Sequence, residues 1–158
     1  GNLPYNISSQ ILIKFLKFKK WPPNYTSLIF MFQKELGDKI MSTFPSSNYG
    51  RISIIRSYRL NAISKFLVKA NSFYPKPKVK SLVIHFIPKN NNSIKIKNIN
   101  NLEKVTNIIF SNKRKMINKS LKKLINIKKI PFSLNLNRRP SDIEPEIYYK
   151  ITNIFEKI

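Results

Sequence analysis

The chain has 158 residues, of which 42% are hydrophobic, so it is long enough to bury a core and lacks the composition of a disordered protein. Lys and Arg total 30 against 7 acidic residues, and the formal net charge of +23 indicates a polyanionic partner, with nucleic acid the first choice. The lack of cysteine excludes disulfides and thiolate chemistry. The single histidine argues against histidine metal sites and Ser-His-Asp triads. No apolar run reaches the roughly 20 residues of a membrane-spanning helix.

The first predicted element is a turn at Asn2-Leu3-Pro4-Tyr5. Pro4 fixes its own φ and keeps Leu3 out of the helical region, so we expect both carbonyl groups to stay free as hydrogen-bond acceptors. The Asn2 side-chain oxygen adds a further acceptor, and Tyr5 adds a flat ring beside them. Acceptors next to a stacking face suit a planar group that carries an NH2, such as the amino edge of adenine. A proline turn that only precedes a helix is the alternative interpretation.

A helix is predicted after this turn from the 3.6-residue spacing of apolar side chains, with Asn6 or Ser8 as its N-cap. Its apolar face consists of Ile11, Leu12, Phe15 and Leu16. Residues 27–32 form a continuous apolar run, which is typical of a strand buried on both faces of a parallel sheet. A helix followed by such a strand predicts an α/β fold. Further elements are expected as a helix at 33–41, a loop at 45–50, an ambiguous segment at 51–58, and strands at 62–69 and 79–87.

The loop at residues 72–78 combines prolines with aromatic and cationic side chains and precedes the strand that contains His85. We interpret His85 as a partly buried structural histidine, since no carboxylate or second histidine lies nearby in the sequence. The polar linker at 89–93 is the expected domain boundary, which divides the chain into residues 1–89 and 94–158. Beyond it the pattern becomes helical, with helices predicted at 102–110, 113–125 and 145–158.

The helix predicted at 113–125 is amphipathic. Its apolar stripe consists of Ile117, Leu121, Leu124 and Ile125, and its basic side consists of Lys115, Lys119, Lys122 and Lys123. Next to the net charge of +23, this basic side favours RNA contact, and a solvated basic face is the alternative interpretation.

Taken in order, six short segments of the sequence resemble the KsgA family of ribosomal RNA adenine dimethyltransferases. They are GNLPYNIS (1–8), FQKE (32–35), YGRIS (49–53), FYPKPKV (73–79), NKRK (112–115) and NKSL (118–121). The resemblance runs from Gly1 to about Ile143. It implies the C-terminal half of a Rossmann-like, S-adenosylmethionine-dependent methyltransferase domain, followed by a small helical RNA-binding domain.

The resemblance also implies roles for single residues. Asn2, with the backbone carbonyls of Leu3 and Pro4, would hold the adenine amino group, and Asn2 and Pro4 would also lie at the cofactor. Tyr5 and Phe73 would stack on the two faces of the base. Seven residues are expected to contact RNA, namely Arg51, Lys76, Lys78, Arg114, Lys115, Lys119 and Lys122.

The implied activity is dimethylation of two adjacent adenines near the 3′ end of small-subunit (16S) ribosomal RNA, with the pre-ribosomal 30S particle as partner. The implied protein is monomeric and cytoplasmic. The chain shows two departures from the family: Lys80 stands where an acidic residue is usual, and the glycine-rich cofactor loop is expected upstream of Gly1. Two alternatives remain open, which are a non-catalytic RNA-binding ribosome-assembly or transcription factor and a large-subunit rRNA methyltransferase of the antibiotic-resistance type.

Overall fold

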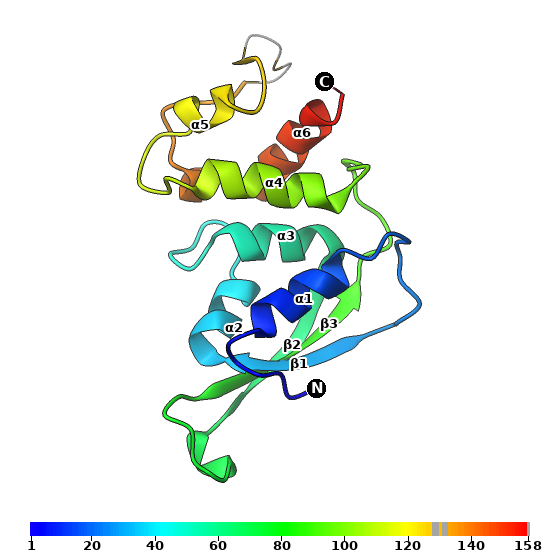
Figure 1. The fold of residues 1–158 in the computed structure, drawn as a ribbon, viewed down its shortest axis with the longest axis vertical. Coiled ribbons are helices and arrows are strands. Elements are labelled where there is room, and N and C mark those ends of the chain that lie inside the picture. Colours follow the sequence, from blue (N-terminus) through cyan, green and yellow to red (C-terminus); the bar gives the residue numbers. More distant parts are fainter. Residues whose placement is uncertain (128–129, 131–132, 158) are drawn as a thin grey trace. The chain divides into compact units, whose positions relative to one another are not determined.

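The structure, a computed structural model, describes residues 1–127, 130 and 133–157. The chain packs as two compact units, one made of residues 1–42 and 56–91 and the other of residues 43–55 and 92–158 (Figure 1). Helix α3 (Arg51–Arg59) gives its first residues to the second unit and its last residues to the first. None of the helices in the described ranges has the length and apolar content needed to cross a bilayer.

The first unit is built on a three-stranded sheet, as the predicted α/β class requires. Its strands are β1 (Leu28–Gln33), β2 (Leu60–Val68) and β3 (Ser81–Pro88), in the order β1-β3-β2. Both pairings are antiparallel, so the parallel sheet expected around residues 27–32 is wrong for these strands. The described residues contain one isolated parallel bridge, between Asn2 and Met31. Burial of β1 on both faces is confirmed except at Ile29, which is 51% exposed, whereas Met31 on the same face is buried.

The predicted helices on either side of β1 are confirmed as α1 (Ser8–Leu16) and α2 (Lys34–Met41). Leu12 and Leu16 of α1 are fully buried, as the apolar spacing predicted. The N-cap prediction is wrong, because Ile7 holds that position and no side chain caps the helix. Ser8 lies inside the helix and its hydroxyl donates to a carbonyl of the preceding turn, at 3.1 Å.

Helix α2 packs on β1 and β3. The contact with β3 depends on Gly37, which is buried. A Cβ atom at this position would lie 2.8 Å from Cδ2 and 3.0 Å from Cβ of Leu82. Glycine therefore allows the backbone of α2 to approach the sheet more closely than any other residue could.

Two buried arginines of α3 bind backbone carbonyls within the first unit. Arg59 donates from Nη1 to Leu16 O at 2.6 Å and to Phe18 O at 2.8 Å, at the end of α1. Its guanidinium also lies 4.5 Å from the centre of the Trp21 ring. Arg56 donates in the same way to the last carbonyls of α2, with Nε 3.0 Å from Ile40 O. Burial lowers the pKa of Arg59.

The second unit is helical. It contains α4 (Ile99–Phe110), α5 (Asn118–Lys122) and α6 (Pro145–Phe155), and α4 packs against α5 and α6. The carboxylate of Glu156 accepts hydrogen bonds from the backbone N–H groups of Lys97 and Asn98, at 2.7 and 2.9 Å, where α4 begins. The helices predicted at 102–110 and 145–158 are confirmed within the described residues; residue 158 lies outside them.

The helix predicted at 113–125 is only partly correct, because α5 covers five residues. The segment before it forms turns. There the N–H of Ile117 donates to the carbonyl of Arg138, at 3.0 Å, and Arg138 belongs to a later segment of the chain. The apolar stripe is nevertheless buried as predicted, with Ile117 and Leu121 at 0% exposure. The side chains predicted to point inward are thus buried, although the helix is shorter than predicted.

Three buried tyrosines bind backbone carbonyls within the second unit. Their hydroxyl groups donate to backbone carbonyls in the pairs Tyr49–Ile143, Tyr148–Pro140 and Tyr149–Ile54. Burial raises the pKa values of Tyr49 and Tyr148, so both hydroxyl groups stay protonated as donors.

Candidate active site and nucleic-acid interface

The N-terminal turn and the proline-rich loop line one hollow in the first unit. Its volume is about 280 Å³. The lining residues are Asn2, Leu3, Pro4, Tyr5, Met31, Phe73, Tyr74, Pro75 and Pro77. The structure therefore brings together all five residues expected to hold a target base, although Phe73 lies about 70 positions along the chain from the turn.

The turn is held from three sides. The N–H of Met31 in β1 donates to Gly1 O at 3.1 Å, which makes the parallel bridge at Asn2. The hydroxyl of Ser8 donates to Tyr5 O at 3.1 Å. The hydroxyl groups of Tyr5 and Ser81 form a hydrogen bond with 2.5 Å between their oxygens, and Ser81 is fully buried at the start of β3. The Tyr5 ring is thus anchored to the sheet at its outer end.

The acceptors of the turn differ from the prediction in one respect. The Pro4 carbonyl accepts a hydrogen bond from the N–H of Ile7 at 3.2 Å, so the expectation that it is free is wrong. A carbonyl oxygen has two lone pairs, and one is still available on Pro4. The described part of the chain supplies no donor to the Leu3 carbonyl, and the Asn2 side chain is exposed. Asn2 and Leu3 therefore offer the accessible acceptors at this hollow.

The aromatic rings at the hollow differ in exposure. Tyr5 and Phe73 are half-buried, whereas the Tyr74 side chain is fully exposed, at 102%. A half-buried ring presents an apolar surface to a ligand while its position is fixed by packing on the other side. Tyr5 and Phe73 therefore have the surroundings expected of rings that stack on a base.

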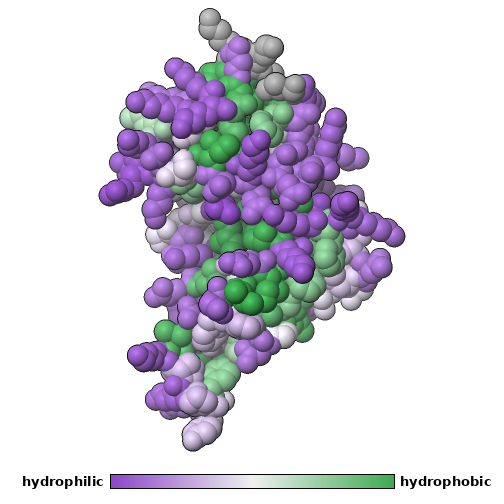
Figure 2. Space-filling view, viewed as in Figure 1, coloured by the Kyte–Doolittle hydropathy of each residue, from purple (hydrophilic) through white to green (hydrophobic). Residues whose placement is uncertain are grey.

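The cations expected to contact RNA lie in both units. In the first unit, Lys76 and Lys78 are exposed and belong to the loop that lines the hollow. In the second unit, four exposed residues, which we call the basic cluster, lie in α5 or in the turns just before it: Arg114, Lys115, Lys119 and Lys122. Figure 2 shows one face of the molecule, on which hydrophilic side chains predominate.

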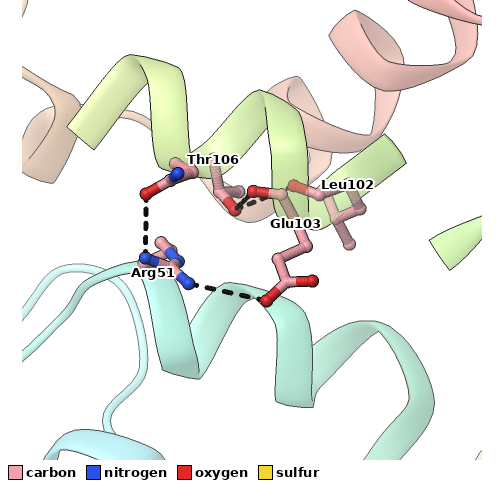
Figure 3. Close-up of polar contacts among 5 residues, drawn as sticks. Arg51, Leu102, Glu103 and Thr106 are labelled. Atoms are coloured by element: carbon pink, nitrogen blue, oxygen red, sulfur yellow. Dashed lines mark hydrogen bonds and ion pairs between the residues drawn. The ribbon is translucent and has the colours of Figure 1, made fainter. Parts of the chain in front are cut away.

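Arg51 has partners within the second unit (Figure 3). Its Nη1 donates to Asn107 Oδ1 at 3.0 Å, and its Nη2 lies 3.6 Å from Glu103 Oε1, both on α4. The Arg51 side chain is still 42% exposed. The charge of Arg51 is therefore partly neutralised, and an RNA phosphate would compete with Glu103 for it.

Sequence reasoning missed Ser81 and Met31 as supports of the turn. Neither position carries a signal that could have found it, since a serine and a methionine in apolar segments have ordinary structural roles. His85, by contrast, lies in β3 and is half-buried, as predicted. Its partner on β1 is Ile29.

Comparison with known proteins places the chain in a family. The family described as ribosomal RNA adenine dimethylase matches residues 1–157. Among curated relatives, the ribosomal RNA small subunit methyltransferase A of Pelagibacter ubique is 43% identical over 100% of this chain and 61% of its own length. The protein of the same name from Zymomonas mobilis is 36% identical over 100% of this chain and 57% of its own length. The chain thus spans about three fifths of these relatives.

Solved structures agree in fold. A dimethyladenosine transferase from Plasmodium falciparum has a TM-score of 0.78 and 24% identity, with 99% of this chain and 65% of that one covered. The 23S rRNA methyltransferase ErmE has a TM-score of 0.66 and 16% identity, with 99% and 64% covered. The resemblance found in the motifs is confirmed by the family match and by the relatives, and the chain belongs to the ribosomal RNA adenine dimethylase family.

Proposed function

We propose that this chain provides the target-base site of an S-adenosylmethionine-dependent methyltransferase that dimethylates two adjacent adenines near the 3′ end of small-subunit (16S) ribosomal RNA during ribosome biogenesis. The observation that carries the proposal is that the turn Asn2–Tyr5 and Phe73 line the same hollow. Family membership and the printed names of the relatives support it.

The role proposed for the turn is to orient the adenine amino group. An adenine amino group has two N–H donors, and the Asn2 side-chain oxygen and the Leu3 carbonyl are acceptors accessible at the hollow. Accepting both hydrogen bonds directs the nitrogen lone pair away from the ring plane, toward a methyl donor. Stacking by Tyr5 and Phe73 fixes the plane of the base, so positioning supplies most of the rate enhancement.

The residues at the hollow are suited to lie beside the methyl donor. Asn2 and Pro4 are the residues that would lie next to S-adenosylmethionine, and the exposed Asn2 amide and the second lone pair of the Pro4 carbonyl are polar groups suited to that contact. The cofactor supplies an electrophilic methyl group that needs no further activation by the protein. No acidic or basic catalyst is therefore required of the residues at the turn.

For the domains, residues 1–89 are proposed as the C-terminal half of the catalytic domain and residues 94–158 as a helical RNA-binding domain. The exposed cations in each support this division of roles: Lys76 and Lys78 near the hollow, and the basic cluster around α5. Arg51 contributes to RNA binding to the extent that a phosphate displaces Glu103. The proposed partner is a pre-ribosomal 30S particle, and the proposed protein is a cytoplasmic monomer.

The test uses a chimera in which residues 1–158 replace the matched segment of the Pelagibacter ubique relative. Asn2→Ala should lower the turnover number for methyl transfer to small-subunit RNA by roughly tenfold or more, since one orienting acceptor worth about 1.4 kcal/mol or more is removed from the transition state. RNA affinity should change little. Asn6→Ala is the matched control, because Asn6 is exposed and does not line the hollow.

Equal turnover in the parent chimera and in Asn2→Ala would show that the motif is only a turn. RNA binding without any methyl transfer by the parent chimera would favour the non-catalytic RNA-binding alternative. Transfer to large-subunit RNA alone would favour the antibiotic-resistance type.

A further inference from the structure

Tyr74 is the most exposed of the large apolar side chains in the described part of the chain, and it stands at the rim of the hollow. Its exposure of 102% means that the ring does not pack against any of the described residues. The neighbouring Phe73 is half-buried at the same hollow, and its N–H bonds to Ala70 O at 3.3 Å. Two consecutive aromatic residues are therefore placed in different ways, one partly packed and one projecting into solvent.

The other tyrosines show that this placement is unusual within the chain. Tyr49, Tyr148 and Tyr149 are buried and their hydroxyl groups donate to carbonyls. A buried tyrosine contributes apolar area to the core, whereas a fully exposed ring contributes none and leaves its apolar surface in water. Tyr74 thus gives the fold no packing energy, and its surface is available to a ligand.

The surroundings of Tyr74 favour a nucleotide. Pro75 and Pro77 line the same hollow and restrict the backbone that carries the ring. Lys76 and Lys78 alternate with these prolines and are exposed. An aromatic face beside a short run of cations is the combination with which proteins hold single-stranded nucleic acid, the ring for a base and the cations for phosphates.

We propose that Tyr74 forms a second base subsite, in which its ring stacks on the base next to the target nucleotide in the RNA. The inference rests on the proposed function, because it takes the hollow to hold a base. A nucleotide whose base has left its stack leaves a neighbour with one exposed face, and that neighbour is tied to it by a single phosphate. A ring at the rim of the hollow can cover the exposed face, and Lys76 or Lys78 can contact the connecting phosphate.

The experiment uses the chimera and short RNAs that carry 2-aminopurine directly before or directly after the target adenine. Stacking on the Tyr74 ring should quench the fluorescence of the probe in one of the two positions. Tyr74→Ala should abolish this quenching and weaken RNA binding roughly fivefold to a hundredfold, the range expected for one base stacked on an aromatic ring. Tyr74→Trp should restore both.

Phe66→Ala is the matched control, because Phe66 is also an exposed aromatic residue, at 60%, but lies in β2 and does not line the hollow. Quenching and affinity that are unchanged in Tyr74→Ala, or reduced equally in Phe66→Ala, would refute the subsite while leaving the proposed function intact. If Asn2→Ala and the parent chimera have equal turnover, the proposed function itself fails. The two failures are therefore distinguished by different variants and different measurements.

Discussion

The hydrogen bond between Tyr5 and Ser81 gives the sharpest test of how the turn is held. Tyr5→Phe removes one hydroxyl and leaves that of Ser81, which is 0% exposed, without this partner and without access to water. The expected loss is about 1–3 kcal/mol in the free energy of unfolding. Ser81→Ala leaves the hydroxyl of the half-buried Tyr5, which can bond to water instead, so the expected loss is about 0.5–1.5 kcal/mol.

The double variant removes both hydroxyl groups and leaves no orphaned donor or acceptor. Its loss should therefore be smaller than the sum of the single losses by about 0.5–1.5 kcal/mol. Urea unfolding of the 158-residue chain at 25 °C measures all four proteins, with the denaturant dependence expected to stay constant across them. In the chimera, each single variant should lower the turnover number roughly threefold to tenfold because the Tyr5 ring is held less firmly, at about 1.4 kcal/mol per factor of ten.

The control pair is Tyr25→Phe with Ser81→Ala. The hydroxyl of Tyr25 donates to Phe15 O at 3.4 Å, so these two changes should be additive. Additivity within about 0.3–0.5 kcal/mol for Tyr5→Phe and Ser81→Ala would refute the coupling. So would a double variant whose turnover falls by the product of the two single effects, because Ser81 would then act through something other than Tyr5.

Two further predictions concern RNA affinity and the α2 contact. Changing the three lysines of the basic cluster to Gln should reduce the slope of log affinity against log salt by about 0.7–0.9 for each RNA phosphate that these side chains no longer neutralise. Since these side chains are exposed, the melting temperature should stay near that of the parent, and an unchanged slope would mean a merely solvated face. Gly37→Ala should lower the free energy of unfolding by about 1–3 kcal/mol, because its methyl group would overlap Leu82 at 2.8 Å. A value near zero in urea unfolding would show that α2 can shift away from β3 at no cost in stability.

The apolar pattern alone predicted where most elements lie but not how they pair. The run at residues 27–32 is a strand, yet the same run is compatible with either pairing direction, since direction is set by the segments that lie beside it in space. Its neighbour is β3, which arrives antiparallel. Burial also varies along β1, since Ile29 is exposed while Met31, on the same face, is buried where it pairs with Asn2.

The helix predicted at 113–125 is only partly formed for a related reason. Its 3.6-residue periodicity correctly identified the inward side chains, and Ile117 and Leu121 are buried. The backbone before Asn118 is nevertheless held by a bond from Ile117 to Arg138, which no local pattern can show. A hydrogen bond between distant segments thus took the place of the helical hydrogen bonds.

At the hollow, the sequence identified the residues that line it and missed those that support the turn. Asn2, Tyr5 and Phe73 belong to short motifs whose residue types are unusual enough to suggest a role. Ser81 acquires its role only because the register of β3 places it next to Tyr5. The free state predicted for the Pro4 carbonyl was wrong, because the turn closes on Ile7.

We expect the arginines of α3 to couple the folding of α1 and α2 to the docking of α3. Helices often end in a glycine that satisfies their last carbonyls locally, but neither α1 nor α2 has a glycine at its C-terminal end. Arg59 and Arg56 bind those carbonyls from a segment that arrives later in the chain. The ends of both helices are therefore completed only when α3 docks, so partly folded chains without α3 gain little from either helix. Lysine provides most of the positive charge elsewhere in the sequence, but its ammonium is a single point, whereas Arg56 donates from three separate nitrogens, to Ile40 O, Leu60 O and Ser42 O.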